Sequence, residues 1–94
     1  MNEELLTKIS NIFNALGNTT RLKILKIVSE SNRPLHIKAI SRELKMRYTA
    51  IYRHISILKN AGLVTIYEVG RSRVVAIAKP ELINELLNFG KKLT

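Results

Sequence analysis

One stretch of the chain, RYTAIYRHISILKNAGLV from Arg47 to Val64, constrains the fold more than any other. Ile51, Ile55 and Leu58 recur at spacings of four and three, so they share one face of a helix. The opposite face carries polar and aromatic side chains, namely those of Arg47, Tyr48, Tyr52, Arg53 and Ser56. This pattern predicts a helix that packs on a core through one face and presents the other face to a partner.

Basic residues gather around this stretch. The chain has 16 Lys and Arg against 7 Asp and Glu, a net charge of +9. Nine of the basic residues and only two of the acidic ones fall between Arg33 and Arg73. Such an excess favours an anionic partner, either nucleic acid or a membrane surface. Because the charge surrounds the exposed helix face, we expect that face to bind nucleic acid.

Length and composition limit the other possibilities. A chain of 94 residues has room for one domain, so we expect residues 1–94 to form a single unit around one core. Cysteine is absent, which excludes disulfides, thiolate metal sites and cysteine nucleophiles and favours a cytoplasmic location. No segment resembles a signal peptide or approaches the length of a membrane span.

Apolar residues recur at helical spacing through four segments, at residues 3–16, 19–31, 37–44 and 48–61. Gly17 is expected to end the first helix, and the Asn18 side chain is suited to cap the second. In the second helix we expect Arg21, Lys23 and Lys26 to point outward, and the inward set to be Leu22, Ile24, Leu25, Ile27 and Val28.

The third and fourth helices are separated only by Lys45, Met46 and Arg47, a spacing typical of a helix-turn-helix. After Gly62 the sequence becomes rich in β-branched residues, which predicts a β-hairpin over residues 63–78 with its turn at Gly70. Pro80 then begins a last helix at residues 80–90. The expected fold is mainly α with a β-hairpin wing (α+β), in the order of a winged helix-turn-helix.

Several pieces of sequence add to this pattern. They are LGNTTRLKIL, ISRELKMRYTAIYRHISILKNAGLV and EVGRSRVVAI. In order and spacing these pieces resemble the ArsR-type family of bacterial and archaeal transcriptional regulators, over about residues 10 to 80.

The resemblance implies a homodimer that pairs through its terminal helices and binds double-stranded DNA. Each protomer would place the recognition helix, residues 48–61, in a major groove and lay the wing along the backbone or minor groove. Side chains near the start of a recognition helix contact base edges, here Arg47, Tyr48, Thr49, Tyr52 and Arg53. Ser56 and Lys59 are expected to contact phosphates, as are Arg71, Ser72 and Arg73 at the wing tip.

The chain also departs from the family. Metal-sensing members carry cysteines at the start of the third helix or carboxylate and histidine ligands on the last, and neither set is present in RPLHIKAI or PELINELLNFGKKL. We therefore expect no metal and no cofactor, and nothing in the sequence identifies an effector ligand. Lys45 stands where the family often has glycine, and Arg47 replaces the usual small hydroxyl cap. Both substitutions add positive charge beside the recognition helix.

Alternative interpretations remain for individual residues. An exposed basic helix face is often only solvated, and Tyr48 and Tyr52 could instead cover the edges of the core. His54 shares a family position where it serves helix packing or phosphate contact. His36 and His54 lack an acidic cluster that would complete a metal site.

The sequence also bears on oligomeric state and on function classes other than specific DNA binding. The apolar residues of helices 3–16 and 80–90 exceed what so small a domain encloses, which favours pairing with a second copy. The carboxylate pairs Glu3 with Glu4 and Glu81 with Glu85 have no associated base, so no enzyme is expected. A repressor is the primary hypothesis. The alternatives are a winged-helix protein-interaction module of a transcription or defence complex, and a nonspecific chromatin-like DNA-binding protein.

Overall fold

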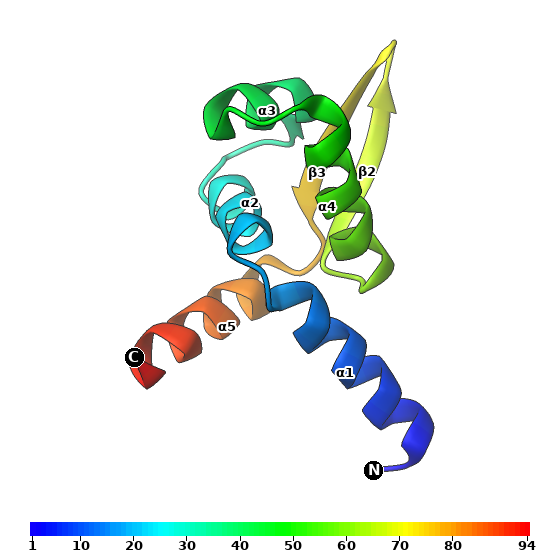
Figure 1. Cartoon of the computed structure of the whole chain (residues 1–94), viewed down its shortest axis with the longest axis vertical. Coiled ribbons are helices and arrows are strands. Elements are labelled where there is room, and N and C mark those ends of the chain that lie inside the picture. The colour runs from blue at the N-terminus through cyan, green and yellow to red at the C-terminus, as the bar shows by residue number, and fades with distance from the viewer.

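The structure is a computed structural model that describes residues 1–94 (Figure 1). It contains five helices and a small sheet, in the order α1 (Glu3–Leu16), α2 (Thr19–Ser29), β1 (Leu35–His36), α3 (Ile37–Leu44), α4 (Tyr48–Asn60), β2 (Val64–Val69), β3 (Ser72–Ile77) and α5 (Pro80–Leu93). The predicted order is confirmed. Helix α2 ends two residues earlier than predicted, α4 ends one residue earlier, α5 continues three residues further, and β1 was not predicted.

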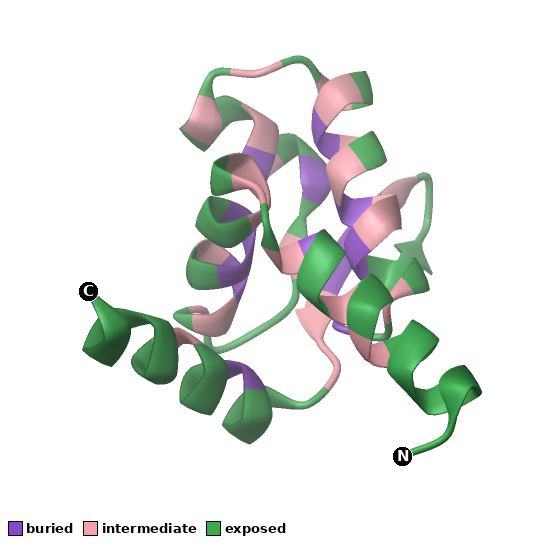
Figure 2. Ribbon diagram, turned by 60° about the horizontal axis from the view of Figure 1, so that its bottom comes forward, coloured by how far each residue is buried: buried purple, intermediate pink, exposed green.

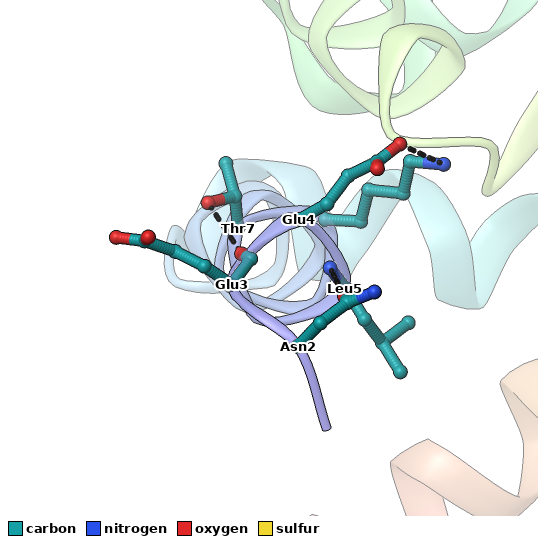
Figure 3. A network of polar contacts seen from close by, with 6 residues as sticks. Asn2, Glu3, Glu4, Leu5 and Thr7 are labelled. Atoms are coloured by element: carbon teal, nitrogen blue, oxygen red, sulfur yellow. Dashed lines mark hydrogen bonds and ion pairs between the residues drawn. The ribbon is translucent and has the colours of Figure 1, made fainter.

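Asparagine side chains begin the first two helices. Asn2 Oδ1 accepts from the Leu5 amide at 2.8 Å, and Asn18 Oδ1 accepts from the Arg21 amide at 3.1 Å. Each bond satisfies one of the amides that a helix start leaves without a partner. In the first turns of α1, Thr7 donates to the Glu3 carbonyl and Lys8 pairs with Glu4 (Figure 3). The predicted cap at Asn18 is confirmed, whereas the cap at Asn2 was not foreseen.

The three strands form an antiparallel sheet in the order β1-β3-β2. Strands β2 and β3 pair from Val64 opposite Ile77 to Val69 opposite Ser72, which leaves a turn of Gly70 and Arg71. Gly70 has φ 61°, a conformation that favours glycine. Strand β1 adds only Leu35 opposite Val75 and His36 opposite Val74, and it ties the start of α3 to the hairpin.

The core lies where the helices meet this sheet. Its 13 buried residues are all apolar: Ala15, Ile24, Leu25, Val28, Ile37, Ile40, Ile51, Ile55, Leu58, Leu63, Val64, Val75 and Ile83. The inward positions predicted for α4 are therefore confirmed. Leu22 was assigned to the core wrongly, since 37% of its surface is exposed and it borders an apolar cavity beside the end of α5.

Helices α1 and α5 extend away from this core in different directions (Figure 1). Each contributes a single buried residue, Ala15 in α1 and Ile83 in α5. Most of their length is exposed (Figure 2), including seven large apolar side chains: Leu5, Leu6, Phe13, Leu82, Leu86, Phe89 and Leu93. The monomer thus leaves much of the apolar surface of its terminal helices uncovered.

Candidate nucleic-acid interface

The turn between α3 and α4 sets the direction of the recognition helix. Lys45 has φ 54° and ψ 44°, a left-handed conformation that favours glycine, and it is the only residue other than glycine with a positive φ. The Met46 amide donates to the Ser41 carbonyl at 3.1 Å and closes the turn. Arg47 then occupies the position before α4 and makes no capping hydrogen bond through its side chain. Lys45 thus places a cation at a position whose left-handed conformation favours glycine. Arg47 places another where a small capping side chain would stabilise the helix start.

Helix α4 separates its side chains as its sequence predicts. Ile51, Ile55 and Leu58 are fully buried. The exposed residues are polar or basic, namely Thr49, Arg53, Lys59 and Asn60, with Arg47 just before the helix, whereas Tyr48, Tyr52 and Ser56 are half-buried. Arg47, Thr49 and Arg53 are therefore presented to solvent at the start and along the first half of the helix.

Tyr48 and Tyr52 form a stacked pair on α4. Their ring centroids lie 6.2 Å apart, with planes inclined by 11°. Both rings also pack against the edge of the core, as the alternative assignment held. Arg73 reaches across from β3, and its Cζ lies 4.8 Å from the centre of the Tyr52 ring. Tyr48, Tyr52 and Arg73 therefore form a row that joins the recognition helix to the wing. The sequence did not reveal this contact.

The wing carries its polar residues at and beside the turn. Arg71 and Arg73 are exposed and Ser72 is half-buried. Arg73 Nε lies 4.0 Å from Glu68 Oε1, so the guanidinium is held between this carboxylate and the Tyr52 ring. Further along α4, Ser56 Oγ donates to the Tyr52 carbonyl at 2.9 Å, which leaves its oxygen lone pairs to accept. Lys59 lies exposed in the last turn of the helix.

Arg21 connects three helices behind this surface. Its Nε donates to the Ala15 carbonyl at 2.7 Å, its Nη2 to the Asn14 carbonyl at 3.2 Å, and its Nη1 lies 3.3 Å from His54 Nδ1. The prediction that Arg21 points outward was wrong. The last turn of α1 contains no basic residue, so the carbonyl oxygens at the C-terminal end of that helix attract the Arg21 cation from α2.

His54 accepts from Arg21 and is therefore neutral in this arrangement. A guanidinium has no acceptor, so Nδ1 of His54 must be unprotonated to complete the bond. Burial lowers the pKa of His54 below its ordinary value of 6.5, and the nearby charges of Arg21 and Arg53 lower it further. Among the alternatives for His54, the structure supports helix packing.

The chain holds no group of three or more His, Asp or Glu side chains arranged to bind a metal ion. Its two histidines lie in different parts of the fold: His54 on α4 contacts Arg21, and His36 directly precedes α3. None of the helices combines the length and the apolar character needed to cross a membrane.

Comparison with known proteins agrees with this geometry. Residues 18–65 match the family described as bacterial regulatory protein, arsR family. The chain is 40% identical over 80 residues to an uncharacterized HTH-type transcriptional regulator of Bacillus subtilis, YuzN, covering 80% of this chain and 87% of the relative. It is 38% identical over 87 residues to another, MJ1325 of Methanocaldococcus jannaschii, covering 84% of this chain and 94% of that one.

Solved structures show the same fold. A possible transcriptional regulatory protein of Mycobacterium bovis, a fragment of residues 1–100, superposes with a TM-score of 0.89 at 25% identity over 99% of this chain and 97% of that one. The homodimeric winged helix-turn-helix DNA-binding domain Mb0332 of the same organism gives a TM-score of 0.86 at 22% identity, over 98% and 89% of the two chains.

The fold and the exposed basic helix therefore define a winged helix-turn-helix protein of the DNA-binding class. Within that class, the chain belongs to the arsR family of bacterial regulatory proteins. The members of this family are transcriptional regulators that bind DNA, and not enzymes.

Proposed function

We propose that this protein is a homodimeric repressor that binds double-stranded DNA at specific sequences. The row formed by Tyr48, Tyr52 and Arg73 carries the proposal, because it makes the recognition helix and the wing one continuous surface. Arg47, Thr49 and Arg53 stand exposed beside that row.

The recognition helix, residues 48–61, enters the major groove with its N-terminal half leading. Arg47 and Arg53 are long enough to bond guanine O6 and N7, and Thr49 offers a methyl group and a hydroxyl to base edges. The half-buried Tyr48 and Tyr52 have less freedom, so their hydroxyl groups suit phosphates or the groove wall. Ser56 and Lys59, further along the helix, contact the backbone.

The wing, residues 63–78, follows the backbone or the minor groove beside the helix. Arg71 at the tip supplies an exposed cation, and Ser72 adds a hydroxyl. Arg73 is held over the Tyr52 ring, so it loses less side-chain freedom when it binds a phosphate. These contacts add affinity without distinguishing sequences.

Two copies pair through α1 and α5, within a single domain that spans residues 1–94. Support comes from the exposed apolar side chains on both helices, among them Phe13 at 60% and Phe89 at 68% exposure. The related M. bovis domain is described as homodimeric. Twofold symmetry then requires a palindromic site whose half-site centres lie one helical turn, about 34 to 36 Å, apart. Occupying such a site in a promoter, in the cytoplasm, would block transcription.

Selection of bound fragments from random or genomic duplexes tests the proposal. The expected result is enrichment of a palindromic motif with that spacing. Duplex affinity without an enriched motif would instead indicate a nonspecific, chromatin-like DNA-binding protein. If no duplex is retained at low salt while a protein co-purifies in fixed stoichiometry, the domain is a protein-interaction module and the proposal fails.

A further inference from the structure

A small basic cavity lies between the wing tip, the start of α3 and the start of α4. It encloses about 250 Å³ and is lined by six residues, His36, Lys38, Tyr48, Arg71, Ser72 and Arg73. Three of these are basic (Lys38, Arg71 and Arg73), one is a histidine, two have hydroxyl groups (Tyr48 and Ser72), and none is acidic. Such a lining attracts an anion and offers it hydrogen-bond donors on more than one side.

Three separate elements bring this lining together. The short strand β1 pairs with β3, His36 opposite Val74, and this pairing sets the first turn of α3 beside the wing. The contact of Arg73 with Tyr52 holds the wing against α4 from the other side. His36 precedes α3 without forming a side-chain cap, so its ring is not engaged with the first amides of that helix.

The position of the cavity indicates which anion it takes. Tyr48 lies in the first turn of α4, the part of the helix that the proposed function places in the major groove. Backbone phosphates border the major groove, and the proposed function lays the wing along the backbone or minor groove beside the helix. A phosphodiester of the duplex is therefore the anion closest to the cavity when the helix is bound.

We propose that this cavity binds one phosphate of the DNA backbone, with His36 and Lys38 of β1 and α3 as contacts additional to those of the recognition helix and wing. This inference rests on the proposed function. It assigns α3 a part in DNA binding, so α3, α4 and the wing would all contact one DNA strand at the same phosphate. The contact fixes the register of the recognition helix on the duplex and carries no sequence information itself.

A phosphate scan tests the proposal on the tightest-bound duplex from the selection. Methylphosphonate replaces one backbone phosphate at a time and removes its charge. Wild-type protein should lose affinity at several positions. In Lys38→Ala the loss at one of these positions should disappear, because the neutral group no longer removes a contact. His36→Asn should weaken the loss at that same position, and asparagine is a preferred residue before a helix, so α3 is kept.

Salt dependence gives a second readout. One lost phosphate contact reduces the slope of log K against log salt by about 0.9, so the affinity of Lys38→Ala should fall about threefold less between 50 and 200 mM salt than that of wild type. Its ratio of specific to nonspecific affinity should stay unchanged. Lys79→Ala is the matched control, since it removes the same charge beyond the other end of β3 and should behave as wild type.

The outcomes separate the two proposals. Absence of any duplex binding by wild-type protein overturns the proposed function, and the phosphate contact with it. Specific duplex binding with the same scan for wild type and Lys38→Ala overturns the phosphate contact alone. Binding of free inorganic phosphate that does not compete with the duplex would assign the cavity to a small anion and also overturn it.

Discussion

The guanidinium carbon of Arg73 on β3 lies 4.8 Å from the ring centre of Tyr52 on α4. This contact fixes the wing against the recognition helix, and it can be measured as a coupling in the free energy of unfolding. A double-mutant cycle of Tyr52→Ala and Arg73→Met, at one fixed protein concentration, should give a coupling of about 0.5 to 1 kcal/mol for an exposed cation over a ring. The same cycle with Tyr52→Phe keeps the ring and should give a coupling near zero. Equal coupling in both cycles would assign the contact to the tyrosine hydroxyl instead.

The burial of His54, together with the charges of Arg21 and Arg53 beside it, makes stability depend on pH. The pKa of His54 is lowered in the folded protein, so the unfolded chain binds more protons than the folded one below about pH 6.5. Stability should therefore be complete above that pH and decrease as the pH falls toward the folded-state pKa. Urea unfolding at pH 7.5 and 5.5 measures the loss. His54→Asn keeps an acceptor near the Nδ1 position but does not titrate, so its loss over this range should be smaller. A loss as large as that of wild type would place the effect elsewhere.

Lys45 lowers the stability of the fold but adds a positive charge near the start of the recognition helix. Its left-handed conformation costs a residue other than glycine about 1 to 2 kcal/mol, partly offset by the entropy that glycine loses on folding. Lys45→Gly should raise the free energy of unfolding by up to about 1 kcal/mol. If the Lys45 ammonium contacts a DNA phosphate, Lys45→Gly should also lower the salt slope of DNA binding by about 0.9. Lys45→Asn tolerates the conformation without the charge and should show the same change in slope. A less stable Lys45→Gly protein would contradict this account.

The terminal helices allow a test of assembly that spares the core. Phe89 is 68% exposed and lies outside the buried cluster, so Phe89→Asp should leave the helical content unchanged. It should shift sedimentation equilibrium toward the monomer, since a carboxylate would be buried in the proposed contact between copies. Asn88→Asp adds the same charge to the neighbouring exposed position and should disturb assembly less. Unchanged dimerisation of Phe89→Asp would move the interface away from this part of α5.

Helices and turns that are encoded by a local sequence pattern were predictable from the sequence. Ile51, Ile55 and Leu58 repeat at helical spacing, and the two glycines at 62 and 70 have positive φ where the turns were expected. Strand β1 has only two residues and no pattern of its own. It forms because the chain entering α3 passes beside β3, which no local signal encodes.

Contacts between distant elements were not predictable. Arg21 was assigned to solvent because charged residues on a helix are usually exposed, yet the carbonyls of Asn14 and Ala15 at the end of α1 attract it. Tyr52 and Arg73 lie 21 residues apart, and only the packing of the hairpin on α4 brings them together. The residue types of the candidate surface thus predicted which side chains it contains. The contacts among those side chains depend on tertiary packing and were not predictable.

Binding to double-stranded DNA as a function of salt tests the central claim most directly. Wild-type protein should prefer the selected palindrome over a scrambled duplex, with log K falling linearly with log salt. Arg71→Ala combined with Arg73→Ala should flatten that slope by about 1.8 and weaken both duplexes equally. Arg53→Ala should instead reduce the preference for the palindrome, by about 1 to 3 kcal/mol if it contacts a base. No affinity of the wild-type protein for either duplex at low salt would contradict the claim.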